Sequence, residues 1–221
     1  ETGINRITWD LRHKPITSVD YSFLFGAARG DKAIQGYTVA PGIYGVRMTY
    51  GEIVQESTVD VEWDPINNYD DRAIEDQQQF LAGAYSMLDT IYKRIDGLQT
   101  IQKQVELRKS IAEDMNDDDL VQRSETLLET LEEWQESVTT PNRGNGQDVL
   151  NIEPTLDAFL TILYQEADSA VLGVTQGQRD RLNDLKPEWT AAMQRWETMM
   201  NSNVAEYSRS AGPAVVVPDW E

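Results

Sequence analysis

The sequence predicts an α+β protein, with a β region over residues 1–66 and a helical region over residues 67–221. Two patterns indicate this class: apolar residues alternate with polar ones in the first region, and they recur at steps of three and four in the second. A chain of 221 residues is long enough for one large or two small domains, each with its own core. We therefore expect a partial antiparallel β-sandwich followed by a long-helix, up-and-down four-helix bundle.

The first expected strand is Ile7–Leu11. Its apolar residues Ile7, Trp9 and Leu11 alternate with polar ones, so they would share one buried face, with Trp9 in the core and Asp10 paired locally. The sequence contains no strand before this one, and an open strand edge is a template for pairing. We therefore expect this strand to pair with a segment upstream of the sequence or with a second copy of the chain.

A β-hairpin is the next expected element. After a Pro-Gly turn, a β-rich run extends from Ile43 to Tyr50, and a second run extends from Ile53 to Val61. Gly51 and Glu52 between them form a tight connection, which is typical of two antiparallel strands.

The β region contains too few strands to form a whole sandwich. Residues 13–39 hold only the short apolar pieces Tyr21–Phe25 and Tyr37–Val39 between glycine-containing loops, and we expect most of this segment to be loop. Only three strands remain, whereas a two-sheet sandwich has about seven. The missing strands are expected upstream of Glu1, so that the chain begins inside a domain.

The helical region begins with two helices that should form an antiparallel hairpin. The first extends from about Asp71 to Glu113, with apolar residues at steps of three and four. The second carries a heptad seam. The residues of this seam are Leu120, Ser124, Leu127, Leu131, Trp134 and Val138.

Two further helices follow the breaker-rich segment Thr139–Asp148. The third helix should turn its apolar residues inward, namely Leu156, Phe159, Leu160, Leu163 and Ala167. The fourth should begin at a capping box formed by Thr175 and Gln178. Its seam consists of Leu182, Leu185, Trp189, Ala192, Trp196 and Met199. Pro213 and Pro218 bracket an extended C-terminal tail.

Composition limits the function. The net charge is −19, from 38 acidic and 19 basic residues, so the field of the protein would repel nucleic acid and anionic membranes. The absence of cysteine removes disulfides, thiolate metal sites and cysteine nucleophiles. No apolar run approaches the roughly 18 residues of a membrane span. We therefore expect that this chain does not bind nucleic acid and does not span a membrane.

A series of short motifs resembles a known family. The β region contains N-R-x-x-W-D-L-R ending at Arg12, then P-G-x-Y-x-V around Tyr44, then V-x-x-D-P from Val61. The helical region contains L-N-x-x-P-x-L, then D-S-A from Asp168, then T-x-x-Q from Thr175. The first two motifs are similar to the Ig-like domains of flagellar hook-capping proteins. The whole series more closely resembles the C-terminal region of bacterial secreted proteins with sortilin-like or neuraminidase-repeat β-propellers.

This resemblance spans nearly the whole chain in the right order, and it implies a place for the chain within a larger protein. The β region would be an Ig-like domain, and the propellers and the first Ig-like strand would precede it. The chain would then be the C-terminal piece of a secreted, periplasmic or cell-surface precursor. The family supplies no agreed catalytic residue in this region.

Several residues could carry chemistry, and each also has a structural interpretation. His13, the single histidine, cannot form a triad or a multi-histidine metal site, so we expect it on a surface or loop. Trp9 and Asp10 could bind a sugar, but the core interpretation is preferred. The loop glycines Gly144 and Gly146 do not form a phosphate cradle, because no strand precedes them and no Lys-Ser/Thr follows.

The acidic segments are the other candidates. Asp114–Glu125 places acidic or amide residues at EF-hand positions one, three, five and twelve. Asp119 stands where an EF-hand needs glycine, so we expect an interhelical turn whose acidic residues cap the second helix, and no tight calcium site. Glu132, Glu133 and Glu136 could imitate a pair of glycosidase carboxylates, but they should lie on a solvent face.

The sequence therefore predicts a non-catalytic structural and interaction module of a secreted sortilin- or sialidase-like β-propeller protein. We expect no catalytic residue, cofactor or metal ligand. Expected partners are the upstream propeller portion of the same precursor, or a second copy through strand pairing. The alternative is a carbohydrate-binding accessory domain of a glycoside hydrolase, which an exposed row of Tyr44, Tyr50 and Trp63 would favour. A weaker third interpretation makes the chain a scaffold for an enzyme whose catalytic site lies in the absent propellers.

Overall fold

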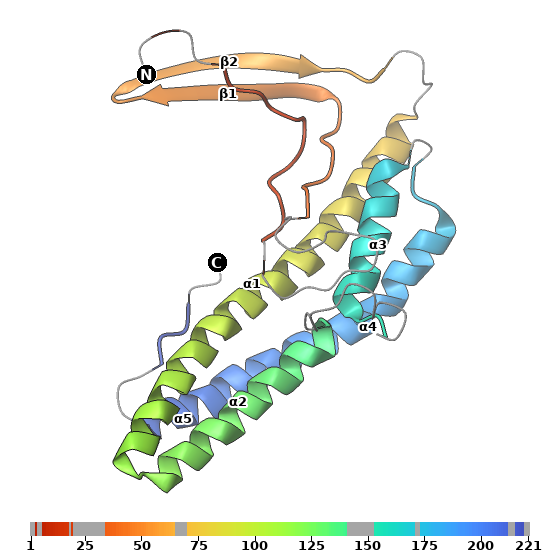
Figure 1. Cartoon of the computed structure of the whole chain (residues 1–221). Helices are drawn as coiled ribbons and strands as arrows, with labels where there is room; N and C mark the ends of the chain where they lie inside the picture. Colours follow the sequence, from red (N-terminus) through yellow and green to blue (C-terminus); the bar gives the residue numbers. More distant parts are fainter. Residues whose placement is uncertain are drawn as a thin grey trace.

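The computed structural model describes residues 3, 6–17, 19, 34–64, 70–140, 153–170, 173–211 and 215–218. The described residues form a two-stranded antiparallel hairpin followed by four long helices and a short terminal one (Figure 1). The α+β class is therefore confirmed. The expected sandwich is not seen in this part of the chain, where the sheet consists of the hairpin alone. The apolar segment Tyr21–Phe25 and the loop glycines Gly144 and Gly146 lie outside the described residues.

The hairpin forms where the alternation predicted it. Strand β1 (Gly42–Tyr50) pairs with strand β2 (Ile53–Val61) in a regular register that runs from Gly42 opposite Val61 to Tyr50 opposite Ile53. The connection is Gly51-Glu52, and Gly51 has a φ of 57°. Glycine adopts this left-handed conformation without the steric cost that a Cβ would add.

The expected strand Ile7–Leu11 does not form, and its apolar face is not buried. Ile7 is 91% exposed, Trp9 40% and Leu11 41%. The chain turns here instead: Asp10 accepts the N–H of Arg12 at 3.1 Å, and Leu11 has a φ of 60°. The indole N–H of Trp9 donates to the carbonyl of Arg12 at 3.0 Å and closes the turn. The prediction of a core Trp9 was wrong because local side-chain hydrogen bonds compete with an extended backbone.

After this turn, residues 11–16 and 34–39 lie side by side, joined by backbone hydrogen bonds and by an isolated β-bridge between Arg12 and Thr38. We call these two segments the stem, which leads into β1. His13 N–H donates to Tyr37 at 3.0 Å, Ile16 N–H to Ile34 at 2.9 Å, and Val39 N–H to Leu11 at 2.9 Å. Gly36 is required in this stem, because a Cβ at its position would lie 2.0 Å from the carbonyl oxygen of His13. Tyr37–Val39, which was expected as loop, is thus one side of the stem.

Helices α1 (Asp71–Met115) and α2 (Asp118–Val138) form the expected antiparallel hairpin. Asp70 caps α1 by accepting the N–H of Arg72, and Asp117 caps α2 by accepting the N–H of Leu120. Between the helices the chain reverses through Asn116, which has a φ of 56°. The seam of α2 is buried as predicted, with Leu120 only partly so.

The second pair of long helices is α3 (Leu156–Ser169) and α4 (Gln176–Met199). The predicted capping box opens α4: Thr175 accepts the N–H of Gln178, and the amide oxygen of Gln178 accepts the N–H of Thr175 at 2.8 Å. A π-helical segment, η2 (Met200–Val204), continues α4 into the short helix α5 (Ala205–Ser210). The predicted seam of α4 is buried except for Trp189, which is partly buried.

Helices α2 and α3 lie end to end along α1, while α4 and α5 extend along the whole assembly (Figure 1). Side-chain bonds support this order. Arg179 of α4 bonds Asp76 near the start of α1, and Tyr207 of α5 bonds Ser124 near the start of α2. With 45 residues, α1 is about 68 Å long, and the shorter α2 and α3 together cover it. Each level of the bundle therefore contains α1, α4–α5 and either α2 or α3, so the expected up-and-down four-helix cross-section does not form.

The stem shares the core of the helices. Ile16, Ile34 and Tyr37 are at most 9% exposed and belong to the same apolar cluster as the helix seams. The hairpin contributes no residue to this cluster and extends away from the helices at one end of the molecule (Figure 1).

Candidate interaction surface

The hairpin has one apolar and one polar face. Paired residues of an antiparallel ladder point to the same side, and successive residues alternate between sides. The register therefore places two sets of side chains on opposite faces. We call the first set the apolar face: it consists of Tyr44, Val46, Met48, Tyr50, Ile53, Gln55, Ser57, Val59 and Val61. The second set, the polar face, consists of Ile43, Arg47, Thr49, Val54, Glu56, Thr58 and Asp60.

The apolar face carries no charge and is largely uncovered. Tyr50 is 78% exposed, Ile53 59%, Met48 50% and Val46 49%. Trp9 lies at one end of this face, where its ring meets Tyr44 edge-on at a centroid distance of 5.3 Å. Contiguous apolar patches of several hundred Å² are uncommon on monomeric proteins and typically mark contact sites.

Apart from the exposed Ile43 and Val54, the polar face carries charged or hydroxyl-bearing side chains, as a solvated surface does. Arg47 and Glu56 lie directly opposite each other and form an ion pair at 2.7 Å, with 72% and 63% of their side chains exposed. Asp60 adds a further charge. The two faces of one hairpin therefore differ in the way that the inner and outer faces of a sandwich sheet differ.

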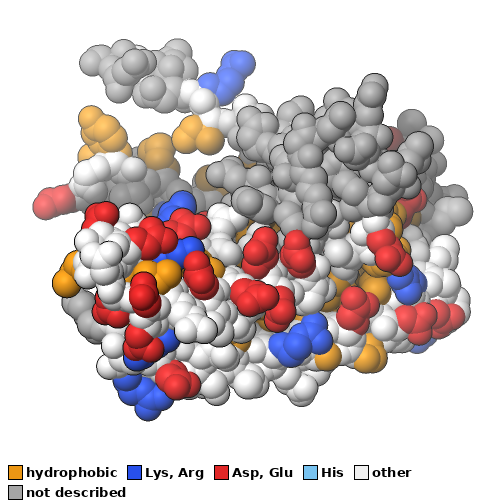
Figure 2. All heavy atoms as spheres, turned by 60° about the horizontal axis from the view of Figure 1, so that its bottom comes forward, with side chains coloured by type: hydrophobic (Ala, Val, Ile, Leu, Met, Phe, Trp, Pro, Cys, Tyr) orange, Lys and Arg blue, Asp and Glu red, His pale blue; other side chains and the backbone are white. Residues whose placement is uncertain are grey.

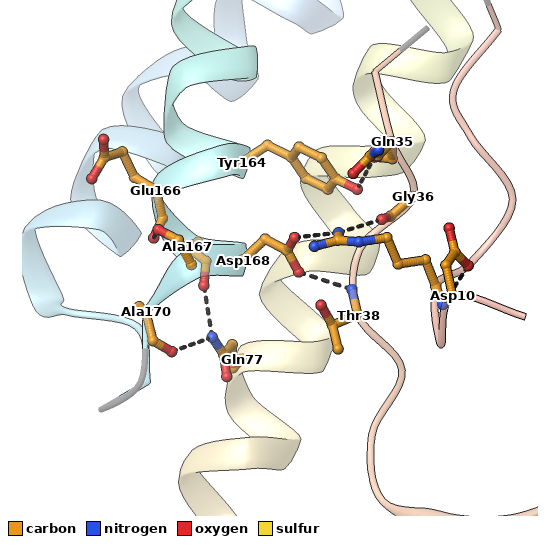
Figure 3. A network of polar contacts seen from close by, with 12 residues as sticks. Asp10, Gln35, Gly36, Thr38, Gln77, Tyr164, Glu166, Ala167, Asp168 and Ala170 are labelled. Carbon is orange, nitrogen blue, oxygen red and sulfur yellow. Dashed lines mark hydrogen bonds and ion pairs between the residues drawn. The ribbon is translucent and has the colours of Figure 1, made fainter. Parts of the chain in front are cut away.

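A polar joint attaches the stem to the helices next to the hairpin (Figure 3). Arg12 donates to Asp168, near the end of α3, at 2.6 Å and to the carbonyl of Gly36 at 2.8 Å. The second oxygen of Asp168 accepts the N–H of Thr38 at 2.8 Å. The Asp168 side chain is only 11% exposed, so one carboxylate holds both sides of the stem in a partly dehydrated site, where charge-assisted hydrogen bonds are strong.

Residues of α1 and α3 complete this joint. Gln78 donates to the carbonyl of Thr38 at 3.0 Å, and Tyr164 donates to the carbonyl of Gln35 at 2.8 Å. Gln77 bonds the carbonyls of Ala167 and Ala170 at the C-terminus of α3. Burial, with the nearby charge of Asp168 as a second cause, raises the pKa of Tyr164, so its hydroxyl remains a donor. The joint is thus a structural contact that positions the hairpin.

The structure separates most of the residues singled out from sequence. His13 stacks on Tyr37 at 4.0 Å in the stem. Trp63 is partly buried and lines a cavity of about 120 Å³ beside the joint, together with residues of α1 and α3. It therefore does not continue a row with Tyr44 and Tyr50 on the sheet.

The acidic segment Asp114–Glu125 forms the expected interhelical turn. Asp114 lies in α1, Asp117 caps α2, and Glu125 lies on α2 and binds Lys109 of α1 at 2.7 Å. This hydrogen bond raises the pKa of Lys109. Glu132, Glu133 and Glu136 are exposed on α2, as expected. Further acidic side chains are spread over the face of the molecule that Figure 2 shows.

Sequence reasoning missed one buried carboxylate. Asp157 of α3 is fully buried and accepts four hydrogen bonds. Tyr92 of α1 and Thr139 after α2 donate to one oxygen, and Thr155 and the N–H of Ala158 donate to the other. Burial raises the pKa of Asp157, and these hydrogen bonds oppose that rise. The only available signal in the sequence was an aspartate inside an otherwise apolar helical run.

The described residues contain no group of three or more His, Cys, Asp or Glu side chains arranged to hold a metal ion. Their helices are too short or too polar to cross a membrane. Searches for similar proteins return no matching family model, no matching curated protein and no matching solved structure.

Proposed function

We propose that this chain is a non-catalytic structural and interaction module of a larger secreted protein, and that its hairpin is one part of an Ig-like sandwich. The observation that carries the proposal is the uncharged, uncovered apolar face of β1 and β2. A two-stranded hairpin alone is marginally stable in water, and it becomes stable when a further layer covers its apolar face. The occupant is β-structure from outside this sequence, namely the upstream portion of the same precursor.

The family-like motifs support this proposal, because the folded chain brings them together. Arg12, which ends the W-D-L-R motif, pairs with Asp168, which begins the D-S-A motif 156 residues later. Trp9 of the first motif meets Tyr44 of P-G-x-Y. We therefore propose a sortilin- or sialidase-like β-propeller precursor, secreted, periplasmic or on the cell surface. The helical bundle caps the propellers and contributes to assembly or surface retention.

Two measurements on the protein isolated from its source test this proposal. The intact mass should exceed the 25.1 kDa of the chain described here. Amide hydrogen exchange in β1 and β2 should be slower in the native protein than in the isolated 221-residue chain, because covered strands open less often. The core amides of α1 provide the control and should exchange equally in both samples. A native mass of 25.1 kDa, or equal exchange of the hairpin amides in a longer protein, contradicts the proposal.

A carbohydrate-binding accessory domain is the second candidate, and the exposed aromatic rings of Trp9 and Tyr50 favour it. Tyr50 lies six positions after Tyr44, which is about 20 Å along a strand, so the rings at the two ends of the face would stack on different sugars of an extended oligosaccharide. Titration with soluble oligosaccharides, monitored by tryptophan fluorescence, tests this function. Saturable binding that is lost in Tyr50→Ala supports the carbohydrate function and not the sandwich.

A further inference from the structure

A single glutamine binds the C-terminal segment of the chain to α1. Residues 215–218 form no helix or strand, and they lie beside α1 after the chain has left α5 (Figure 1). Gln104 of α1 accepts the N–H of Val216 at 2.9 Å and donates to the carbonyl of Val216 at 3.0 Å. In an antiparallel sheet, two paired residues exchange both bonds in this way. The side-chain amide of Gln104 therefore takes the place of a neighbouring strand.

Two further hydrogen bonds complete the contact. The amide nitrogen of Gln104 also donates to the carbonyl of Thr100, one turn earlier in α1, at 3.1 Å. A carbonyl only accepts, so this bond fixes which end of the amide is the donor. The hydroxyl oxygen of Ser208 in α5 accepts the N–H of Val215 at 3.2 Å. Side chains from α1 and α5 thus bind the backbone of two successive residues.

The side chains of the segment differ in burial. Val215 is 6% exposed and belongs to the apolar core cluster, whereas Val216 and Val217 are 68% and 43% exposed. The contact therefore selects an apolar side chain of valine size at the first position. At the second position it binds the backbone and leaves the side chain in solvent.

This segment is held less firmly than the helix beneath it. One buried valine and three hydrogen bonds hold it, and the two bonds to Gln104 are exposed. Ile101 and Val105, on either side of Gln104 in the sequence, are fully buried in the core. Segments with few buried contacts and exposed hydrogen bonds open at a lower free energy than the core does. The segment should therefore detach while the bundle remains folded.

We propose that Gln104, Ser208 and the core contacts around Val215 form a peptide-binding site, which we call the tail site. Its resident ligand is the C-terminal segment of the chain, and the docking of this segment is reversible. The ligand class is a non-helical peptide in which a β-branched apolar residue precedes a residue with a free backbone N–H. A second copy of the segment occupies the site when the resident one is released. The proposal does not rest on the proposed function, because the tail site includes no residue of the hairpin.

Amide hydrogen exchange of the full 221-residue chain tests the reversible docking. The amide of Val216 should exchange faster than that of Val105 in the core of α1. Gln104→Ala should accelerate exchange at Val216 about five- to thirtyfold, as expected when two hydrogen bonds are lost. Gln122→Ala, at an exposed glutamine of α2, is the matched control and should change nothing at Val216. Exchange at Val216 that is as slow as at Val105, or that does not respond to Gln104→Ala, overturns the proposal.

A fluorescent peptide with the sequence of residues 211–221 tests recognition in trans, with fluorescence anisotropy as the measurement. The full chain with Val215→Asp should release its own segment, because a carboxylate replaces the buried valine, and it should bind the peptide at least about tenfold more tightly than the wild type does. Val215→Ala, a milder change, should act in the same direction. An N-methyl group on Val216 of the peptide removes the N–H that Gln104 accepts and should abolish the gain. Adding Gln104→Ala to the Val215→Asp chain should do the same.

Two controls make the binding experiment decisive. Circular dichroism verifies that each variant retains its helices. Met48→Lys, added to the Val215→Asp chain, should leave peptide binding unchanged, because it alters only the apolar face of the hairpin. Equal binding to the wild type and to both Val215 variants overturns the proposal. Binding that survives N-methylation, or that is lost in Met48→Lys, also overturns it.

Discussion

The hairpin and the helical bundle follow equally regular sequence patterns, yet their apolar residues have opposite environments. In the bundle, seam residues such as Leu131 are fully buried, whereas Tyr50 on the apolar face of the hairpin is 78% exposed. The difference is that each helix has neighbours within the chain, whereas among the described residues only Trp9 meets the apolar face of the hairpin, at one end. A periodic pattern determines which side of an element is apolar, but burial depends on a second element to cover that side.

The largest expected difference between the two regions concerns tryptophan. Trp134 and Trp196 are 4% and 3% exposed, and their rings pack at 4.6 Å. Each change to alanine should lower the free energy of unfolding by roughly 3–5 kcal/mol, because a large cavity remains. Urea denaturation followed by circular dichroism measures this loss. Trp9→Ala, at a site that is 40% exposed, is the control. Losses near zero at both buried sites would show that the helix seams are misassigned.

Two ion pairs provide the next comparison. Asp168→Ala should lower the free energy of unfolding by about 1–3 kcal/mol, since it removes the carboxylate that pairs with Arg12 and leaves the N–H of Thr38 without its acceptor in a partly buried joint. Glu56→Ala removes the exposed ion pair with Arg47 on the hairpin and should cost less than about 0.5 kcal/mol. Hydrogen exchange at Thr38 should also accelerate in the first variant only. Equal effects of the two changes would contradict a structural role for the joint.

The buried carboxylate of Asp157 should make the stability of the bundle depend on pH. Its pKa is higher in the folded protein than in the unfolded chain, so folding favours the protonated form. This stabilisation is complete below the ordinary pKa of about 3.9, and it is lost as the pH rises through the raised value. Asp157→Asn cannot titrate. As the pH rises above about 4, the unfolding free energy of the wild type should therefore fall relative to that of this variant.

Urea denaturation at several pH values measures this trend. Asp184→Asn, at an exposed site of α4, controls for the loss of one carboxylate. A difference between Asp157→Asn and the wild type that does not change with pH would mean that Asp157 has the same pKa in the folded and unfolded states.

The smallest expected effect is on the apolar face of the hairpin. Met48 is 50% exposed in a strand without a covering layer, so Met48→Ala should change the unfolding free energy of the 221-residue chain by less than about 0.5 kcal/mol. In a longer precursor with a complete sandwich, the same change should cost about 2–5 kcal/mol. A cost of that size in the isolated chain would show that the face is already covered.

The positions of most elements were determined by the sequence itself. The hairpin follows from alternation around Gly51, and the start of α4 follows from the reciprocal capping of Thr175 and Gln178. Both are local interactions, in which neighbouring residues supply the hydrogen bonds and the turn geometry. The same holds for the turn between α1 and α2, where Asp117 caps the second helix.

Interactions between distant residues were decided only by the tertiary structure. Ile7–Leu11 alternates as a strand does, but a buried face needs a covering layer, and the described chain places none there. The joint between Arg12 and Asp168 connects residues 156 positions apart, and no local pattern specifies such a pair. The arrangement of α2 and α3 end to end along α1 has the same origin. Heptad seams predict that helices pack, but the relative lengths of the helices and the contacts between them decide which helices meet at each level.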